Sequence, residues 1–186
     1  DGSVYRVVPV ETGVRAIRAW AEHPWPMSPA QALALRDRLG WTSSPTNERM
    51  FTTDHGIGEK DASFNTIEAG GDTRTVSSFH LSLTSRIPKP VRAEAVPTAE
   101  RAFDAYVEAL TALYGQGKRG KRKQHASMTW ALPSDASVRI GTVGWVIDVG
   151  VNSPELNEIA RGEAQYFAEI TDENDVPYID IDNPDS

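Results

Sequence analysis

The stretch Phe79-His80-Leu81-Ser82-Leu83-Thr84 decides the fold, because apolar and polar side chains alternate along it without a break. This alternation has the period of a β-strand with one buried face and one exposed face. We extend the strand over residues 75–85. Two shorter strands are predicted before it, at residues 50–53 and 63–68, and glycine-rich turn residues connect them. The sequence therefore predicts a three-stranded antiparallel meander.

Helix signals frame this meander. Ser28, Pro29 and Gln31 make a capping box that opens a helix, which ends at Gly40. A longer helix over residues 98–114 carries apolar side chains at spacings of three and four. A short helix over residues 14–23 and a short strand over residues 4–8 are predicted near the start.

The strand pattern returns after the long helix. Three further strands are predicted at residues 127–132, 137–142 and 145–151, and Ser153-Pro154 opens a short final helix. The order is then α-βββ-α-βββ-α, with an extra element at each end. We expect an α+β fold, in which a mostly antiparallel sheet has helices packed on one face, with an acidic C-terminal extension. Residues 1–163 form the expected single domain, and residues 164–186 form the acidic segment.

The composition is that of one folded domain. Of the 186 residues, 39% are hydrophobic, and a chain of this length buries one core. There is no cysteine, which excludes disulfides and thiolate chemistry and agrees with a cytoplasmic location. No apolar run approaches the roughly 18 residues of a membrane span, so we expect no membrane insertion.

Negative charge is concentrated in the last fifth of the chain. Residues 153–186 carry ten carboxylates and one arginine, a net charge of −9, whereas residues 1–152 sum to +2. This acidity argues against nucleic-acid binding, which depends on clustered lysine and arginine. It favours a protein partner with a basic surface.

The segment at residues 115–124 is polar and basic. Its three glycines match the spacing of the dinucleotide fingerprint, but the segment follows a helix and precedes a strand, which reverses the required order. We interpret it as a loop. Its bases fit a solvated surface, a phosphate or RNA contact, or docking of the acidic segment within the same molecule. These bases are Lys118, Arg119, Lys121, Arg122 and Lys123.

The four histidines lack the spacing of a metal-binding or catalytic motif. His55 lies in a glycine-flanked turn and His80 on the polar side of a strand. Pairing of their strands would bring the two rings together, which is the basis of a hydrolase hypothesis that we favour least. We expect no enzyme activity, no cofactor and no metal.

Several short motifs resemble those of a family of small, uncharacterised actinobacterial proteins. They extend over residues 14–152 and comprise Trp25-Pro26-Met27-Ser28, residues 35–41, residues 103–106, Leu113-Tyr114-Gly115, Trp130-Ala131-Leu132 and Trp145-Val146-Ile147. The resemblance implies an immunity protein, which neutralises a secreted toxin from the same locus, and it implies no catalytic residues. The element order also resembles that of small secretion chaperones.

We therefore expect a non-enzymatic protein whose acidic surface blocks the basic cleft of a folded toxin. Carboxylates suit such a cleft and speed association, and tryptophan is enriched at interfaces. The residues expected to bind the partner are Glu169, Asp172, Glu173, Asp175, Asp180 and Asp182, with Tyr178, Trp20 and Trp25 as apolar anchors. The alternative is a secretion chaperone that holds an extended segment along a sheet edge.

Overall fold

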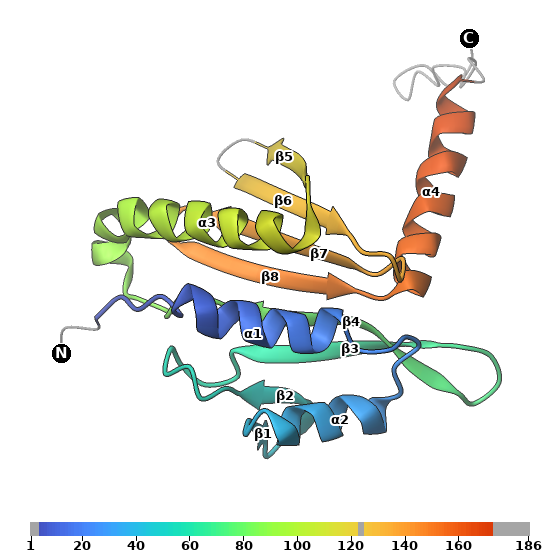
Figure 1. Ribbon diagram of the computed structural model, residues 1–186, viewed down its shortest axis with the longest axis horizontal. Helices are drawn as coiled ribbons and strands as arrows, with labels where there is room; N and C mark the ends of the chain where they lie inside the picture. Colours follow the sequence, from blue (N-terminus) through green and yellow to red (C-terminus); the bar gives the residue numbers. More distant parts are fainter. Residues whose placement is uncertain (1–3, 123–124, 173–186) are drawn as a thin grey trace, which may run out of the picture.

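The computed structural model describes residues 4–122 and 125–172 and has the predicted α+β fold (Figure 1). The helices are α1 (Val10–Ala21), α2 (Pro29–Arg38), α3 (Arg92–Tyr114) and α4 (Pro154–Asp172), with a 3-10 turn η1 (Lys89–Val91) before α3. The strands are β1 (Thr42–Ser44), β2 (Asn47–Thr52), β3 (Ala62–Glu68), β4 (Arg74–Ser82), β5 (Lys118–Arg122), β6 (His125–Ala131), β7 (Ser137–Val143) and β8 (Val146–Asn152).

The strands form one antiparallel sheet in the order β1-β2-β3-β4-β8-β7-β6-β5. Two four-stranded meanders meet at its centre, where Phe79 of β4 pairs with Val151 of β8. Helices precede each meander, so the topology repeats although the sequence has no fixed-period repeat. The predicted antiparallel sheet is confirmed.

The number of strands exceeds the two predicted sets of three. β1 lies outside the predicted strands, and β5 occupies the segment for which the sequence predicts a loop. β5 has no apolar alternation and lies at the edge of the sheet, where charged side chains are common. It is a strand because it pairs with β6, from Lys118↔Thr129 to Arg122↔His125. The strand predicted at residues 4–8 is reduced to one bridge between Val7 and Thr84.

Local signals place α2 as predicted. The Gln31 N–H donates to Ser28 Oγ at 3.2 Å, and the Ser28 N–H donates to Gln31 Oε1 at 2.8 Å, so the capping box is complete. At the other end, Gly40 has a φ of 74° and the Trp41 N–H donates to the Arg36 carbonyl at 3.2 Å. These bonds satisfy backbone groups that the helix termini leave without partners.

Helices α1, α2 and α3 cover one face of the sheet, and the core lies between these helices and the strands (Figure 1). An aromatic cluster around Trp20 of α1 fills its centre. The Trp20 ring stacks on Phe79 of β4 with centroids 4.1 Å apart and an interplanar angle of 3°. The rings of Trp41 and Phe51 lie beside the Trp20 ring, with their centroids 6.4 and 6.1 Å from its centroid.

The opposite face of the central strands is polar, because His80, Asp148 and Arg139 alternate with core residues along β4, β8 and β7. Helix α4 begins at one end of this face. The Thr75 hydroxyl donates to Glu155 Oε2 at 2.9 Å, and the Ser137 hydroxyl donates to Asn157 Oδ1 at 3.1 Å. The first turn of α4 is tied to the sheet in this way.

Candidate functional site

Helix α4 is exposed over most of its described length. Ser153 caps it, with the Leu156 N–H donating to Ser153 Oγ at 3.1 Å. From Glu158 to Ala168 every residue is exposed, and the helix stands away from the sheet (Figure 1). A helix of this length gains most of its stability from packing. The exposed part of α4 is therefore a candidate for contact with another molecule.

Large apolar side chains lie on this exposed helix. Ile159 is 48% exposed, Tyr166 is 61% exposed and Phe167 is 64% exposed. The two aromatic rings contact each other edge to face, with centroids 5.8 Å apart. Glu158 and Glu163 lie on the same helix, so α4 presents an aromatic pair among carboxylates.

The structure places the predicted partner-binding carboxylates only in part. Glu169 and Asp172 lie in the C-terminal part of α4. The others lie outside the described residues, namely Glu173, Asp175, Tyr178, Asp180 and Asp182. α4 has 19 residues, so the prediction of a short helix is wrong. The helix also runs across the predicted boundary between residues 163 and 164, which makes the beginning of the acidic segment helical.

The two tryptophans predicted at the partner surface differ in burial. Trp20 is fully buried, so the prediction of a surface position for it is wrong. It occupies the inner face of α1 with Ala16 and Ile17, at helical spacing. Trp25 is half-buried, and its indole N–H donates to the Ala21 carbonyl at 3.4 Å. Trp20 is therefore a core residue.

His55 and His80 lie on different sides of the sheet. The His55 ring packs edge-on against Trp41 of the core with centroids 5.7 Å apart, whereas His80 Nε2 lies 3.2 Å from Ser78 Oγ on the polar face. The expectation that the two rings approach each other is therefore wrong. Within residues 4–122 and 125–172, no cluster of three or more histidine, aspartate and glutamate side chains is placed to hold a metal ion.

Burial makes His55 a source of pH-dependent stability. Its side chain is 4% exposed, and burial lowers its pKa despite the opposing effect of Asp54 and Asp61. The unfolded chain has the ordinary pKa of about 6.5, so below that pH the unfolded state binds more protons. The resulting contribution to stability is complete above about pH 6.5 and is lost as the pH falls towards the folded pKa.

We predict that, as the pH is lowered, the free energy of unfolding falls less for His55→Gln than for the wild type. Urea unfolding of both proteins between about pH 7.5 and pH 5 measures it, and the difference between the two curves isolates His55 from other titrating groups. His125→Gln, at an exposed histidine, is the matched control. Parallel curves for the wild type and His55→Gln would contradict the prediction.

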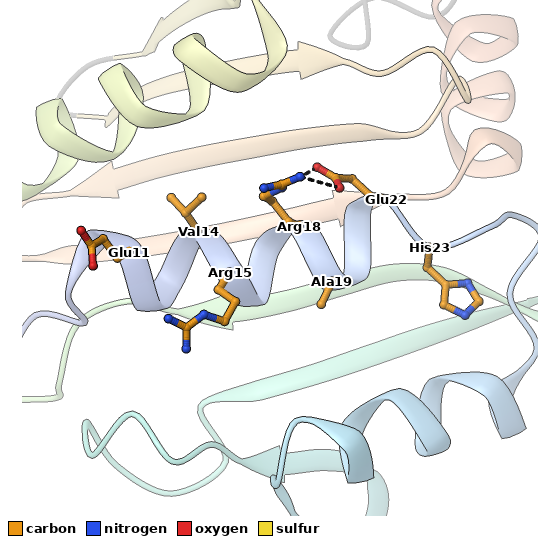
Figure 2. A pocket seen from close by; sticks show the side chains of 7 residues that line it. All are labelled: Glu11, Val14, Arg15, Arg18, Ala19, Glu22 and His23. Atoms are coloured by element: carbon orange, nitrogen blue, oxygen red, sulfur yellow. Dashed lines mark hydrogen bonds and ion pairs between the residues drawn. The ribbon is translucent and has the colours of Figure 1, made fainter.

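A hollow of about 600 Å³ follows α1 (Figure 2). All its lining residues come from α1 and the turn after it: Glu11, Val14, Arg15, Arg18, Ala19, Glu22 and His23. Arg18 Nε lies 2.8 Å from Glu22 Oε1, and the Tyr114 hydroxyl donates to the same oxygen at 3.2 Å. The hollow is thus the outer side of one helix, and two of its charges pair with each other.

A comparison with protein families separates α4 from the rest of the chain. Residues 11–153 match the model of a family of unknown function, DUF6301. The chain belongs to the DUF6301 family. No curated protein and no solved structure matches it. The DUF6301 match ends at Ser153 and α4 begins at the next residue, so the exposed helix lies outside the family domain.

Sequence reasoning missed the aromatic pair of this DUF6301 protein, although a signal for it exists. Leu156, Ile159 and Ala160 recur at helical spacing, and Phe167 follows Ala160 by seven residues on the same stripe. The stripe indicates an amphipathic helix as far as Phe167. Among the described helices, none is long and apolar enough to cross a bilayer.

Proposed function

We propose that this DUF6301 protein is a non-enzymatic, cytoplasmic binding protein that neutralises a secreted toxin encoded at the same locus. The observation that carries the proposal is α4, which leaves the family domain and exposes Tyr166 and Phe167 among carboxylates. Aromatic side chains dominate binding energy at interfaces, whereas surface charge accelerates association and selects the partner. The α4 surface combines both properties.

The partner that suits α4 is a folded protein with a basic cleft whose floor is apolar. An amphipathic helix binds such a cleft through apolar anchors on one face. The net charge of −9 over residues 153–186 complements a cleft that binds a phosphate-bearing substrate. The toxin would be inhibited because the helix occupies the space of its substrate, and the carboxylates of residues 153–186 would supply the complementary charge.

We predict that Tyr166→Ala combined with Phe167→Ala weakens toxin binding by at least about 30-fold, the loss expected for an interface hot spot. The matched control is Leu113→Ala, which removes a side chain of α3 that is 43% exposed. Calorimetric titration with the purified toxin gives both affinities, and circular dichroism tests that each variant is folded. Equal binding by the wild type and the double variant would refute the assignment of α4.

Edge strand β5 favours a second candidate function, that of a secretion chaperone. β5 pairs with β6 on one side, so its other edge can accept an extended segment of a client protein. The bases of β5 suit an acidic client. Sizing with the partner separates the two functions, because an immunity protein binds a folded toxin one to one, whereas a chaperone holds an extended client.

A further inference from the structure

The polar face of the sheet contains a hollow of about 370 Å³, which extends over β4, β8, β7 and β6. This volume lies in the range of small-molecule sites in proteins. His80, Arg139 and Asp148 line it, together with two glycines from central strands, Gly141 and Gly150. The hollow is separate from α4 and does not depend on the function proposed for that helix.

The two glycines create the hollow because they leave out side chains. Gly150 pairs with His80 on one side and Arg139 on the other, and Gly141 pairs with Asp148 and Ser127. A Cβ added at Gly150 would lie 3.8 Å from His80 Nδ1, and one added at Gly141 would lie 3.8 Å from the Ala126 carbonyl oxygen. Neither distance is a clash, so the packing of the fold does not require glycine. A glycine inside a strand often marks close approach of a ligand.

Two opposite charges face this space without pairing. Arg139 and Asp148 are diagonal neighbours across β7 and β8, a relation that separates side chains by roughly 7–8 Å. Neither forms an ion pair within the part of the chain that the structure describes. The Ser82 hydroxyl orients Asp148 by donating to its Oδ1 at 3.1 Å.

His80 adds an uncharged polar group beside the two charges. Burial by the neighbouring strands lowers the pKa of His80, and Asp148 opposes that shift. Burial therefore favours the neutral imidazole, and Nδ1 is left for a ligand because Nε2 lies 3.2 Å from Ser78 Oγ. The hollow thus contains a cation, a carboxyl group and two imidazole rings, because His125 also lines it.

We propose that this hollow binds a small zwitterion of the amino-acid class. Its carboxylate would pair with the Arg139 guanidinium, in the geometry that arginine favours for carboxylates, and its ammonium group would pair with Asp148. The body of the ligand would lie over Gly141 and Gly150, with His80 beside it. A zwitterion complements both charges at once. A simple anion would pair with Arg139 but would place its negative charge opposite the Asp148 carboxylate.

The test measures ligand-observed NMR and the shift in melting temperature of the full chain with each of the twenty free amino acids. Propionate and ethylamine, each with one of the two charges, are the matched probes. We expect at least one amino acid to bind and to raise the melting temperature, with both single-charge probes at least about tenfold weaker. The proposal would be overturned if propionate bound as tightly as every amino acid, or if none of the twenty amino acids bound.

Variants then assign the binding to this hollow. Gly150→Ala places a methyl group in it without a clash and should retain the fold while weakening binding by about tenfold or more. Arg139→Gln and Asp148→Asn should each weaken binding by a similar factor. Gly162→Ala, at an open position on α4, is the control and should bind as the wild type does. Unchanged affinity in Gly150→Ala would place the ligand elsewhere and refute the site.

Discussion

Replacing Trp20 with alanine lowers the free energy of unfolding by about 3–5 kcal/mol, the usual cost of truncating a buried tryptophan. Trp20 is fully buried and stacks on Phe79 at 4.1 Å, so its removal leaves a cavity between α1 and the sheet. Domains of this size are stable by about 5–15 kcal/mol. The substitution therefore removes a large part of the total stability, which urea unfolding followed by far-UV circular dichroism measures.

Two further variants test whether burial is the cause. Trp25→Ala should cost less, since Trp25 is half-buried in the connection between α1 and α2. Trp20→Phe should also cost less, because it retains the stacked ring and removes an indole N–H that has no hydrogen-bond partner within the described residues. A loss for Trp20→Ala below that for Trp25→Ala would contradict the placement of Trp20 at the centre of the core.

Gly13→Ala should destabilise the protein by about 2–5 kcal/mol, through overpacking and loss of a buried hydrogen bond. A Cβ on Gly13 would lie 2.1 Å from the hydroxyl oxygen of Tyr106. That hydroxyl donates to the Val8 carbonyl at 2.8 Å and the Tyr106 side chain is fully buried, so moving the ring aside would break this bond or disturb the core. Alanine is otherwise the better helix former, so a loss of stability reports the contact with Tyr106.

A double-mutant cycle identifies the contact. Tyr106→Phe removes the hydroxyl that Gly13 faces, so the two substitutions together should cost less than the sum of the single losses. Gly162→Ala, in the exposed part of α4, should raise the free energy of unfolding by up to about 1 kcal/mol. Thermal and urea unfolding give all four values. A stabilising Gly13→Ala would contradict the close packing of α1 on α3.

Local sequence signals predicted the parts of the fold that depend on neighbouring residues. The capping box of Ser28 and Gln31, the αL glycine at Gly40 and the alternation along residues 79–82 each act over a few residues, and the structure confirms them. The predicted alternation fails at Thr84, which lies after β4 and is buried. Such signals could not predict edge strand β5, because its basic sequence has no alternation and its conformation comes from pairing with β6. Helix α3 begins at Arg92, before the predicted start at residue 98, and includes Pro97 and the buried Ala95.

The candidate site could be predicted less well than the fold. The acidic character of the C-terminal region follows from composition, but the display of Tyr166 and Phe167 depends on α4 leaving the sheet after one turn. The hollow beside Gly150 depends on which strands become neighbours. His80, Asp148 and Arg139 come from three separate strands, and no local pattern relates them.

By itself, the sequence determined the periodicity of the strands, the ends of α2 and the uneven distribution of charge. Each depends on side chains close together in the chain, where the backbone allows few arrangements. The pairing of β4 with β8, the burial of Trp20 and the hollow at two glycines on the polar face all depend on contacts between distant parts of the chain. Strand alternation shows which face of a strand is buried but not which strand lies beside it, because hydrogen bonding between backbones is the same for every sequence.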